Sequence, residues 1–171
     1  MSVRRSLAMI GAAGAMMLAS TGTAYAAPSS PMNDAEANEM LRLVNVARST
    51  PRQCGAQGFG PAAALAMNGA LALSAQWHSD DLANGAPFGH TGSDGSAPWD
   101  RMLAAGYTWS AAAENVAAGY SSVKAVVDGW LKSPGHCANI MNPALTEFGA
   151  ARAYNGGSKY RYYWTQDFGA R

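Results

Sequence analysis

The C-terminal part of the chain changes its hydrophobic period, and this change most constrains the fold. Residues 147–154 and 160–168 have the composition of strands, and residues 155–158 between them read Asn-Gly-Gly-Ser, which is typical of a hairpin turn. One side of the second strand is strongly aromatic and is formed by Tyr160, Tyr162, Trp164, Gln166 and Phe168. This face is too apolar to remain in water, so we expect helices to cover the sheet.

Helical periodicity precedes the hairpin in four segments. We expect helices from Asn33 to about Ser49, from Asn68 to Asn84-Gly85, from Pro98 to Gly106, and from Ser121 or Ser122 to Trp130-Leu131. Pro134-Gly135 is expected to break the last helix and to leave His136 on a turn, and residues 51–66 are expected to form a loop. Helices before a terminal antiparallel hairpin predict an α+β fold with helices on both faces of a small sheet.

The first residues have the three parts of an export signal. Arg4 and Arg5 precede an apolar run, and Thr23-Ala24-Tyr25-Ala26 is a small-residue cleavage pattern. We therefore expect a signal peptide over residues 1–26, a short tether over 27–32 and one domain over 33–171. The apolar run is shorter than the roughly 20 residues that span a bilayer, so we expect no transmembrane anchor. We expect the processed protein to be secreted to the periplasm or the cell exterior. We also expect it to be a monomer.

Charge excludes a nucleic-acid binder. Removing Arg4 and Arg5 leaves 12 − 2 = 10 basic residues against 11 acidic ones, so the processed chain carries about −1. Polyanion-binding domains carry a clear excess of Lys and Arg. We expect no nucleic-acid partner.

Two cysteines, Cys54 and Cys137, lie in the part that is expected to be exported. An even pair in an oxidising compartment favours a disulfide, which would stabilise the domain by roughly 4 kcal/mol. The alternative is that Cys137, beside His136, is the nucleophile of a cysteine hydrolase.

Three other residues are candidates for chemistry. His78 lies on the buried stripe of the second helix, where a histidine is either a core residue bonded to backbone or a ligand. His90 lies in a Gly/Ser-rich loop with Asp94, which is either a turn residue or a carboxylate ligand. Glu114 lies in an apolar segment, so its carboxylate needs a partner or a raised pKa, and a histidine pair would be such a partner.

The chain resembles the CAP superfamily of cysteine-rich secretory proteins, antigen 5 and pathogenesis-related 1 proteins, in its bacterial secreted branch. The resemblance rests on five motifs in the family's order: Asn45-Val46-Ala47-Arg48, Gly89-His90-Thr91, Ala113-Glu114-Asn115-Val116, Ser133-Pro134-Gly135-His136 and Tyr163-Trp164-Thr165-Gln166. It implies a three-layer α-β-α sandwich (SCP-like fold) with a small central antiparallel sheet.

The resemblance also implies a cleft lined by two histidines and two glutamates that can hold a divalent metal. His90, Glu114 and His136 match three of these positions, whereas Ser133 stands where the second glutamate is expected. Two imidazoles, one carboxylate and water form an acceptable shell for zinc, but serine is a poor ligand. We therefore expect weak binding of zinc or another divalent cation.

Two functions follow from the resemblance and the residues. The first is a secreted ligand-binding or interaction module, whose partner is a sterol, a fatty acid, another lipid or a protein. The second is a hydrolase of peptide or cell-wall substrates, either metal-assisted with Glu114 as ligand or base, or built on Ser133 as nucleophile with His136 as base. No nucleophile-elbow sequence surrounds Ser133, and the chain predicts no catalytic residue beyond these.

Overall fold

The computed structural model describes residues 32–171. The expected signal peptide and residues 27–31 of the expected tether lie outside the described residues. The helices are α1 (Asp34–Arg48), α2 (Gly69–Ala83), α3 (Pro98–Ala104), α4 (Val123–Lys132) and α5 (Pro134–Met141). The strands are β1 (Arg52–Cys54), β2 (Gln57–Phe59), β3 (Ala66–Met67), β4 (Ala111–Ala118), β5 (Glu147–Tyr154) and β6 (Tyr162–Ala170).

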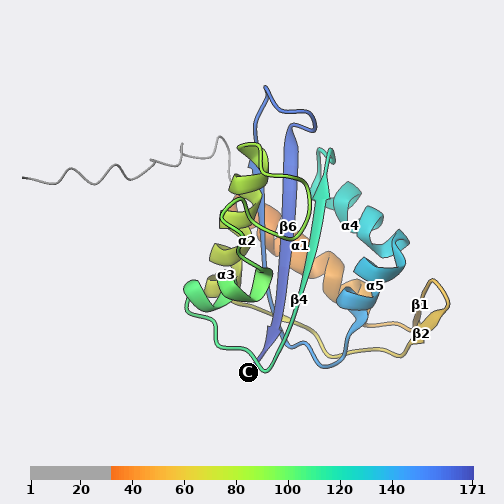
Figure 1. The fold of residues 1–171 in the computed structure, drawn as a ribbon. Coiled ribbons are helices and arrows are strands. Elements are labelled where there is room, and N and C mark those ends of the chain that lie inside the picture. The colour runs from red at the N-terminus through yellow and green to blue at the C-terminus, as the bar shows by residue number, and fades with distance from the viewer. Residues whose placement is uncertain (1–31) are drawn as a thin grey trace, which may run out of the picture.

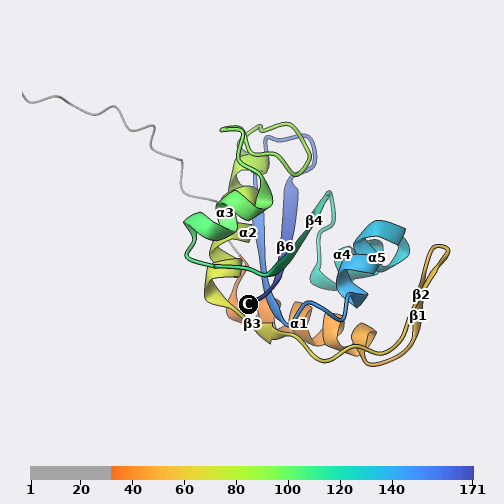
Figure 2. The ribbon, with the colours of Figure 1, turned by 60° about the horizontal axis from the view of Figure 1, so that its bottom comes forward.

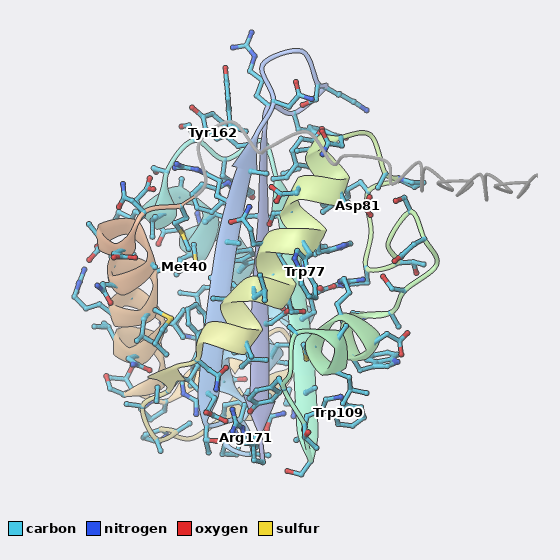
Figure 3. All side chains as sticks on the ribbon, turned by 90° about the vertical axis from the view of Figure 1, so that its left-hand side faces the viewer. Met40, Trp77, Asp81, Trp109, Tyr162 and Arg171 are labelled. Atoms are coloured by element: carbon cyan, nitrogen blue, oxygen red, sulfur yellow. A yellow bond between two sulfur atoms is a disulfide. The ribbon has the colours of Figure 1, made fainter. Side chains whose placement is uncertain are left out.

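The elements form three layers, as the sequence predicted (Figure 1). The middle layer is a four-stranded sheet with the order β3-β5-β6-β4. Helices α2 and α3 cover one face, and α1, α4 and α5 cover the other; Figure 3 shows α1 with Met40 and α2 with Trp77 on opposite sides of the strands. The long strands β4, β5 and β6 are antiparallel, whereas the short β3 runs parallel to β5. The fold is α+β.

The aromatic hairpin forms the centre of the core. On β6, Trp164 and Phe168 are fully buried in the cluster that α1, α4 and α5 complete. Tyr163, on the other face, packs with Leu82 of α2. The sequence predicted that one aromatic face would be covered, and the structure buries residues of both faces because helices pack on each side. Tyr160 is the exception to the prediction, because it lies before β6 and is 39% exposed.

Local signals position the first two helices. Asn33 caps α1: Glu36 N donates to Asn33 Oδ1 at 3.0 Å, and Asn33 N donates to Glu36 Oε2 at 3.1 Å. Asn68 caps α2 by accepting from the amides of Ala70 and Leu71. Both N-termini were predicted, because each cap satisfies amides that have no partner within the helix.

The prediction that His136 lies on a turn is wrong. Pro134 occupies the first turn of α5, and His136 lies in the same turn of that helix. Proline is tolerated there because the first amides of a helix have no intrahelical partner, so Pro134 ends α4 but begins α5. The loop predicted over residues 51–66 likewise contains the β1–β2 hairpin.

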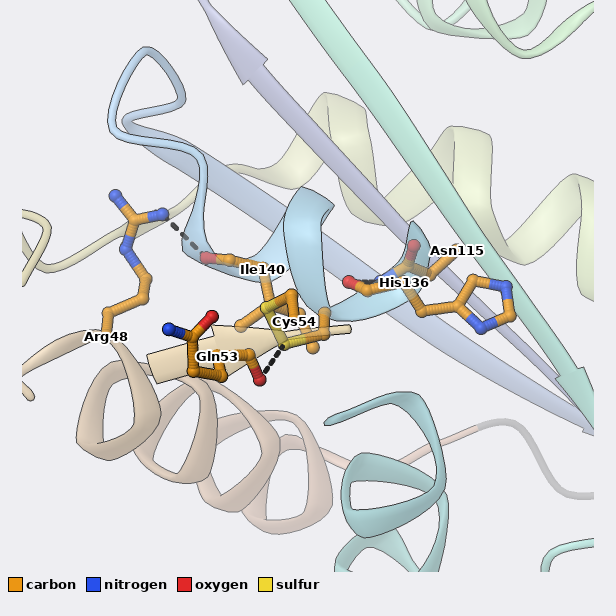
Figure 4. The surroundings of a disulfide bond; sticks show 7 residues. Arg48, Gln53, Cys54, Asn115, His136 and Ile140 are labelled. Atoms are coloured by element: carbon orange, nitrogen blue, oxygen red, sulfur yellow. Dashed lines mark hydrogen bonds between the residues drawn. A yellow bond between two sulfur atoms is a disulfide. The ribbon is translucent and has the colours of Figure 1, made fainter. Parts of the chain in front are cut away.

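The predicted disulfide between Cys54 and Cys137 is present and joins β1 to α5. The alternative of Cys137 as a catalytic nucleophile is therefore wrong, and no free cysteine occurs among residues 32–171. Figure 2 shows the β1–β2 hairpin extending beside α5, and Figure 4 shows the disulfide between them.

Arg48 fastens the end of α1 to the segment that follows α5. Its buried guanidinium donates to the carbonyls of Ala63, Ile140, Asn142 and Leu145 over 2.7–3.0 Å. Four main-chain acceptors satisfy this charge without a carboxylate, so this motif residue has a structural role. None of the helices in the described part of the chain has the length and apolar character needed to cross a membrane.

Candidate functional site

Glu114 is the centre of the candidate site. It lies in the middle of β4, one of the two edge strands of the sheet, and its side chain is 2% exposed on the face that α2 and α3 cover. Its Oε1 accepts a hydrogen bond from His90 Nδ1 at 2.8 Å, and its Oε2 accepts one from Arg101 Nη2 at 2.6 Å. The expected histidine partner is therefore present, but a buried guanidinium is a second partner.

Arg101 is the residue of the site that the sequence interpretation missed. It projects from α3, and the same guanidinium donates to the carbonyls of His90, at 3.1 Å, and of Ser96, at 3.0 Å. It thereby holds both ends of the loop that carries His90 and neutralises the Glu114 carboxylate. The position of Glu114 in an apolar segment did indicate that its carboxylate needs a partner, and a cation is one such partner. Nothing in the local sequence indicates which residue supplies it.

His90 presents its imidazole to solvent, with the side chain 52% exposed. The hydrogen bond with Glu114 raises the pKa of His90. Because that bond uses Nδ1, the second ring nitrogen, Nε2, is left facing away from the carboxylate. A carboxylate that fixes one ring nitrogen in this way determines both the tautomer and the orientation of the imidazole.

His136 of α5 lies beside β4 and within electrostatic reach of His90. Burial lowers the pKa of His136, and the charge of His90 lowers it further. The main chain of His136 is held by Asn115 of β4, whose Nδ2 donates to the His136 carbonyl at 3.2 Å (Figure 4). Asn139 of α5 donates to the Glu114 carbonyl and to Asn115 Oδ1. These two asparagines link α5 to β4, so they set the position of His136 relative to Glu114.

His78 is a core histidine, as one of the two alternatives predicted. It is fully buried on α2, and its Nε2 lies 2.8 Å from the carbonyl oxygen of Gly89. The same nitrogen is 3.9 Å from Glu114 Oε1, and burial lowers the pKa of His78. A buried neutral imidazole of this kind supports the loop before His90 rather than facing a ligand.

A second carboxyl group lies beside Glu114. Asp167 of β6 is its register partner across the sheet and is fully buried. Burial raises the pKa of Asp167 well above its usual range, and the charge of Glu114 raises it further. Burial therefore favours the neutral form of Asp167, and Arg101 donates its hydrogen bond to Glu114 of this carboxyl pair. The sequence interpretation placed this residue in a strand without assigning it to the site.

Asp94 and Ser133, the two other candidates, lie outside this network. Asp94 Oδ1 accepts from Ser96 N at 2.8 Å, which is the bond of a turn residue. Ser133 precedes α5 and makes no cap hydrogen bond with its side chain. In the part of the chain that the structure describes, Ser133 makes no hydrogen bond to His136.

The arrangement bears on the predicted metal set of His90, Glu114 and His136. Among residues 32–171, no three His, Cys, Asp or Glu side chains come together as a group that could hold a metal ion. Both Glu114 oxygens are engaged, one of them by the Arg101 cation, so this carboxylate does not fit a direct ligand. It fits the outer position that orients His90, which leaves two imidazoles as the available protein ligands.

Comparisons with known proteins agree with this architecture. The chain is 32% identical to the Bacillus subtilis protein YkwD over 148 residues, which is 86% of this chain and 51% of that protein. The fold is similar to that of an extracellular protein with an SCP domain from Bacillus anthracis, with a TM-score of 0.63 at 25% identity, covering 84% of this chain and 45% of that one. It is also similar to an outer surface protein of Borrelia burgdorferi, with a TM-score of 0.60 at 17% identity, covering 83% of this chain and 98% of that one.

The chain spans about half the length of the two Bacillus proteins, so the similarity concerns only a part of each. The family model of cysteine-rich secretory proteins, CAP, matches residues 41–168. This match runs from the second half of α1 through most of β6 and includes every residue of the Glu114 network. The chain therefore belongs to the CAP family, the cysteine-rich secretory protein family.

Proposed function

We propose that this CAP domain is an exported ligand-binding module whose ligand contacts the imidazoles of His90 and His136. The observation that carries the proposal is the hydrogen bond from His90 Nδ1 to the buried Glu114, which orients an exposed imidazole within electrostatic reach of His136. The N-terminal signal pattern and the extracellular or surface origin of the similar proteins support export.

The ligand that suits two neighbouring imidazoles is a divalent cation such as zinc. Histidine binds zinc through a neutral ring nitrogen, and a carboxylate on the other nitrogen raises the basicity of the ligand. Two protein ligands with water are fewer than the four of a structural zinc site, so binding is weak. Glu114 acts here through His90, which replaces its expected role as a direct ligand.

A weakly held cation with water in its shell can accept an anionic group from a partner. The carboxylate of a fatty acid and an acidic protein side chain are both oxygen donors of this kind. A sterol has no such group and would need an apolar surface instead. The proposal therefore favours anionic lipids or proteins over sterols as partners.

Calorimetric titration of zinc into the oxidised domain tests the proposal. We expect saturable binding that is lost in His90→Ala and in His136→Ala, because each removes one of two ligands. Glu114→Gln keeps both imidazoles and should weaken binding by about 10- to 100-fold, the usual effect of losing an outer carboxylate. Zinc binding that is unchanged in His136→Ala would refute the site.

Hydrolysis is the second candidate, and one observation favours it. His90 and Glu114 form the pair of a general base and its orienting carboxylate, at 2.8 Å. A hydrolase of this type would use His90 to activate water, since Ser133 is not bonded to an imidazole. Turnover of a peptide, ester or peptidoglycan substrate that disappears in His90→Ala would establish it, and no turnover with or without zinc would exclude it.

A further inference from the structure

A cavity separate from the imidazole pair lies between the β1–β2 hairpin and α5. It has a volume of about 640 Å³ and is lined on one side by residues 57–61 and on the other by residues of α5 and the segment after it. Figure 2 shows the hairpin standing beside α5, with the loop that continues from β2 below. Ligand sites in proteins usually enclose about 300–1,000 Å³, so this volume suits a small molecule.

Amide side chains supply the polar atoms of the cavity wall. Gln57 projects from β2, and Asn139 and Asn142 come from α5 and its C-cap. An amide offers both donors and acceptors without charge, and none of the described residues that line the cavity has an ionisable side chain. Asn139 Nδ2 and Asn142 Oδ1 already make hydrogen bonds within the protein, which leaves the Gln57 amide, Asn139 Oδ1 and Asn142 Nδ2 for a ligand. The wall therefore matches a ligand that both donates and accepts hydrogen bonds and carries no net charge.

Main-chain atoms and one ring complete the wall. Gly58 and Gly60 have no side chains, so they line the cavity with main-chain atoms. Phe59 is partly buried against the core and lines the cavity together with Pro61 and Pro143. A flat apolar surface beside hydrogen-bonding groups suits a sugar ring, which has an apolar C–H face and a polar rim.

Other ligand classes fit this wall poorly. An aliphatic chain would cover the Gln57 amide and the unbonded atoms of Asn139 and Asn142 without giving them hydrogen bonds, which costs free energy for each group. An ion would find no countercharge. A peptide that adds a strand needs a longer edge than β2, which spans only Gln57–Phe59.

We propose that the cavity between the β1–β2 hairpin and α5 is a binding site for an uncharged saccharide. The site contains neither imidazole, and of its lining residues Asn139 alone belongs to the Glu114 network, where its Nδ2 is bonded. It adds a second ligand class to an exported domain.

The two walls of this site are fastened to each other. Cys54, at the end of β1, is bonded to Cys137, which directly precedes Ala138 of the opposite wall. The hairpin turn also contacts α5, since a Cβ placed on Gly55 would lie 3.0 Å from Pro134 Cβ. A cavity whose walls are cross-linked is preorganised, so a saccharide need not order the hairpin when it binds.

Gly60 provides a variant that blocks the cavity without touching the rest of the domain. Its φ lies outside the left-handed region, and a Cβ built there has no atom within 4 Å, so a side chain extends into open space beside the cavity. Gly60→Trp should fill the site, whereas Gly60→Ala adds one methyl group and is the matched control. Gln57→Ala removes a wall amide from an exposed position and tests the same site without adding bulk.

The experiment is an NMR titration of the oxidised domain with neutral tetrasaccharides of N-acetylglucosamine, mannose and glucose. We expect at least one to shift the amides of residues 57–60 at millimolar concentration. Gly60→Trp and Gln57→Ala should each weaken this binding by about tenfold or more, while Gly60→Ala and His90→Ala should change it by less than about twofold.

Three results would overturn the proposal: no shifts with any of the three sugars, shifts confined to other parts of the domain, or binding that survives both Gly60→Trp and Gln57→Ala. The saccharide proposal would also be overturned, in favour of a lipid, if laurate binds the wild-type domain and does not bind the Gly60→Trp variant. The zinc titration separates this site from the imidazole pair, because Gly60→Trp should leave the zinc heat unchanged and His136→Ala should leave the sugar response unchanged.

Discussion

The guanidinium of Arg101 donates a 2.6 Å hydrogen bond to Glu114 while the two side chains are only 7% and 2% exposed. Glu114 of this ion pair also accepts the hydrogen bond from His90 Nδ1, so a buried ion pair holds the exposed imidazole in place. Breaking such a pair leaves a charge without compensation in the interior, which is far costlier than losing a surface ion pair. The candidate site is therefore also a structural element of the α3–β4 contact.

Arg101→Met should destabilise the domain by about 3–5 kcal/mol, because it leaves the Glu114 carboxylate buried and unpaired. The double variant Arg101→Met/Glu114→Gln removes both charges and should recover part of this loss. Urea unfolding of the two variants and the wild type measures the difference. A loss below about 1 kcal/mol in Arg101→Met would contradict the assignment of a buried ion pair.

The three histidines should titrate in a defined order. The Glu114 hydrogen bond raises the pKa of His90, whereas burial lowers the pKa values of His78 and His136. His90 should therefore charge first as the pH falls, and Glu114→Gln should lower its pKa. NMR titration of the imidazole resonances measures each value directly, and a His90 pKa below that of His136 would contradict the geometry.

These shifts have opposite effects on stability. A raised pKa means that the folded state holds the His90 proton more tightly than the unfolded state does. The contribution of His90 to folding stability is therefore fully present below the unfolded pKa of about 6.5, and it is lost as the pH rises through the folded pKa. A depressed pKa has the reverse effect, so His78 and His136 weaken folding as the pH falls below about 6.5. Stability profiles of His78→Gln and His90→Gln, compared with the wild type, should differ in sign.

Asp80 and Asp81 are adjacent on α2, but removing their charges should change the stability of the domain in opposite directions. Burial raises the pKa of Asp80 to about 6, so its charge opposes folding at neutral pH. This cost is fully present above pH 6 and disappears as the pH falls towards the ordinary Asp value of about 3.9. Asp80→Asn should therefore stabilise the domain by about 1 kcal/mol at pH 7, allowing for partial solvent screening.

Asp81→Asn is the matched control for this change. The Asp81 carboxylate accepts hydrogen bonds from the amide and the hydroxyl of Ser93, and so anchors the loop that carries His90. Its loss should destabilise the domain by about 1–3 kcal/mol, because hydrogen bonds to a charged group are removed. Thermal unfolding at pH 7 and pH 5 of both variants tests the contrast, which fails if Asp80→Asn is destabilising at pH 7.

Reduction of the Cys54–Cys137 bond should destabilise the domain by about 4 kcal/mol. The two cysteines are 83 residues apart, and closing a long loop removes much of the entropy of the unfolded chain. Urea midpoints with and without a reducing agent measure the loss. The double variant Cys54→Ser/Cys137→Ser should match the reduced protein and be insensitive to the reducing agent, and a midpoint that is the same in both redox states would refute the prediction.

Gly149 of β5 should not tolerate any side chain. A Cβ there would lie 2.1 Å from the amide nitrogen of Ala72, so α2 packs directly on the strand. Gly149→Ala must push the helix away from the sheet and should cost about 3 kcal/mol or more. Gly135→Ala is the control, since a Cβ on this residue of α5 meets no atom within 4 Å. Equal unfolding midpoints for the two variants would show that the α2–β5 contact is not tight.

Several local features of the structure could be predicted from the sequence. The caps at Asn33 and Asn68, the hairpin around residues 155–158 and the pairing of the two cysteines each depend on short-range chemistry or on the export context, and all agree with the structure. The α+β class follows as well, because an aromatic hairpin needs helices to cover it. The first turn of α5 was misread because Pro134 both ends one helix and begins the next.

Only the tertiary structure decided how the chemical groups meet. The sequence indicates that Glu114 needs a partner, but Arg101 on α3 and Asp167 on β6 reach it through the order of strands and the packing of a helix on the sheet. No local pattern in the sequence indicates that these residues lie in contact. The same packing makes Glu114 a support for His90 and joins the β1–β2 hairpin to α5, because burial and charge neutralisation act through space rather than along the sequence.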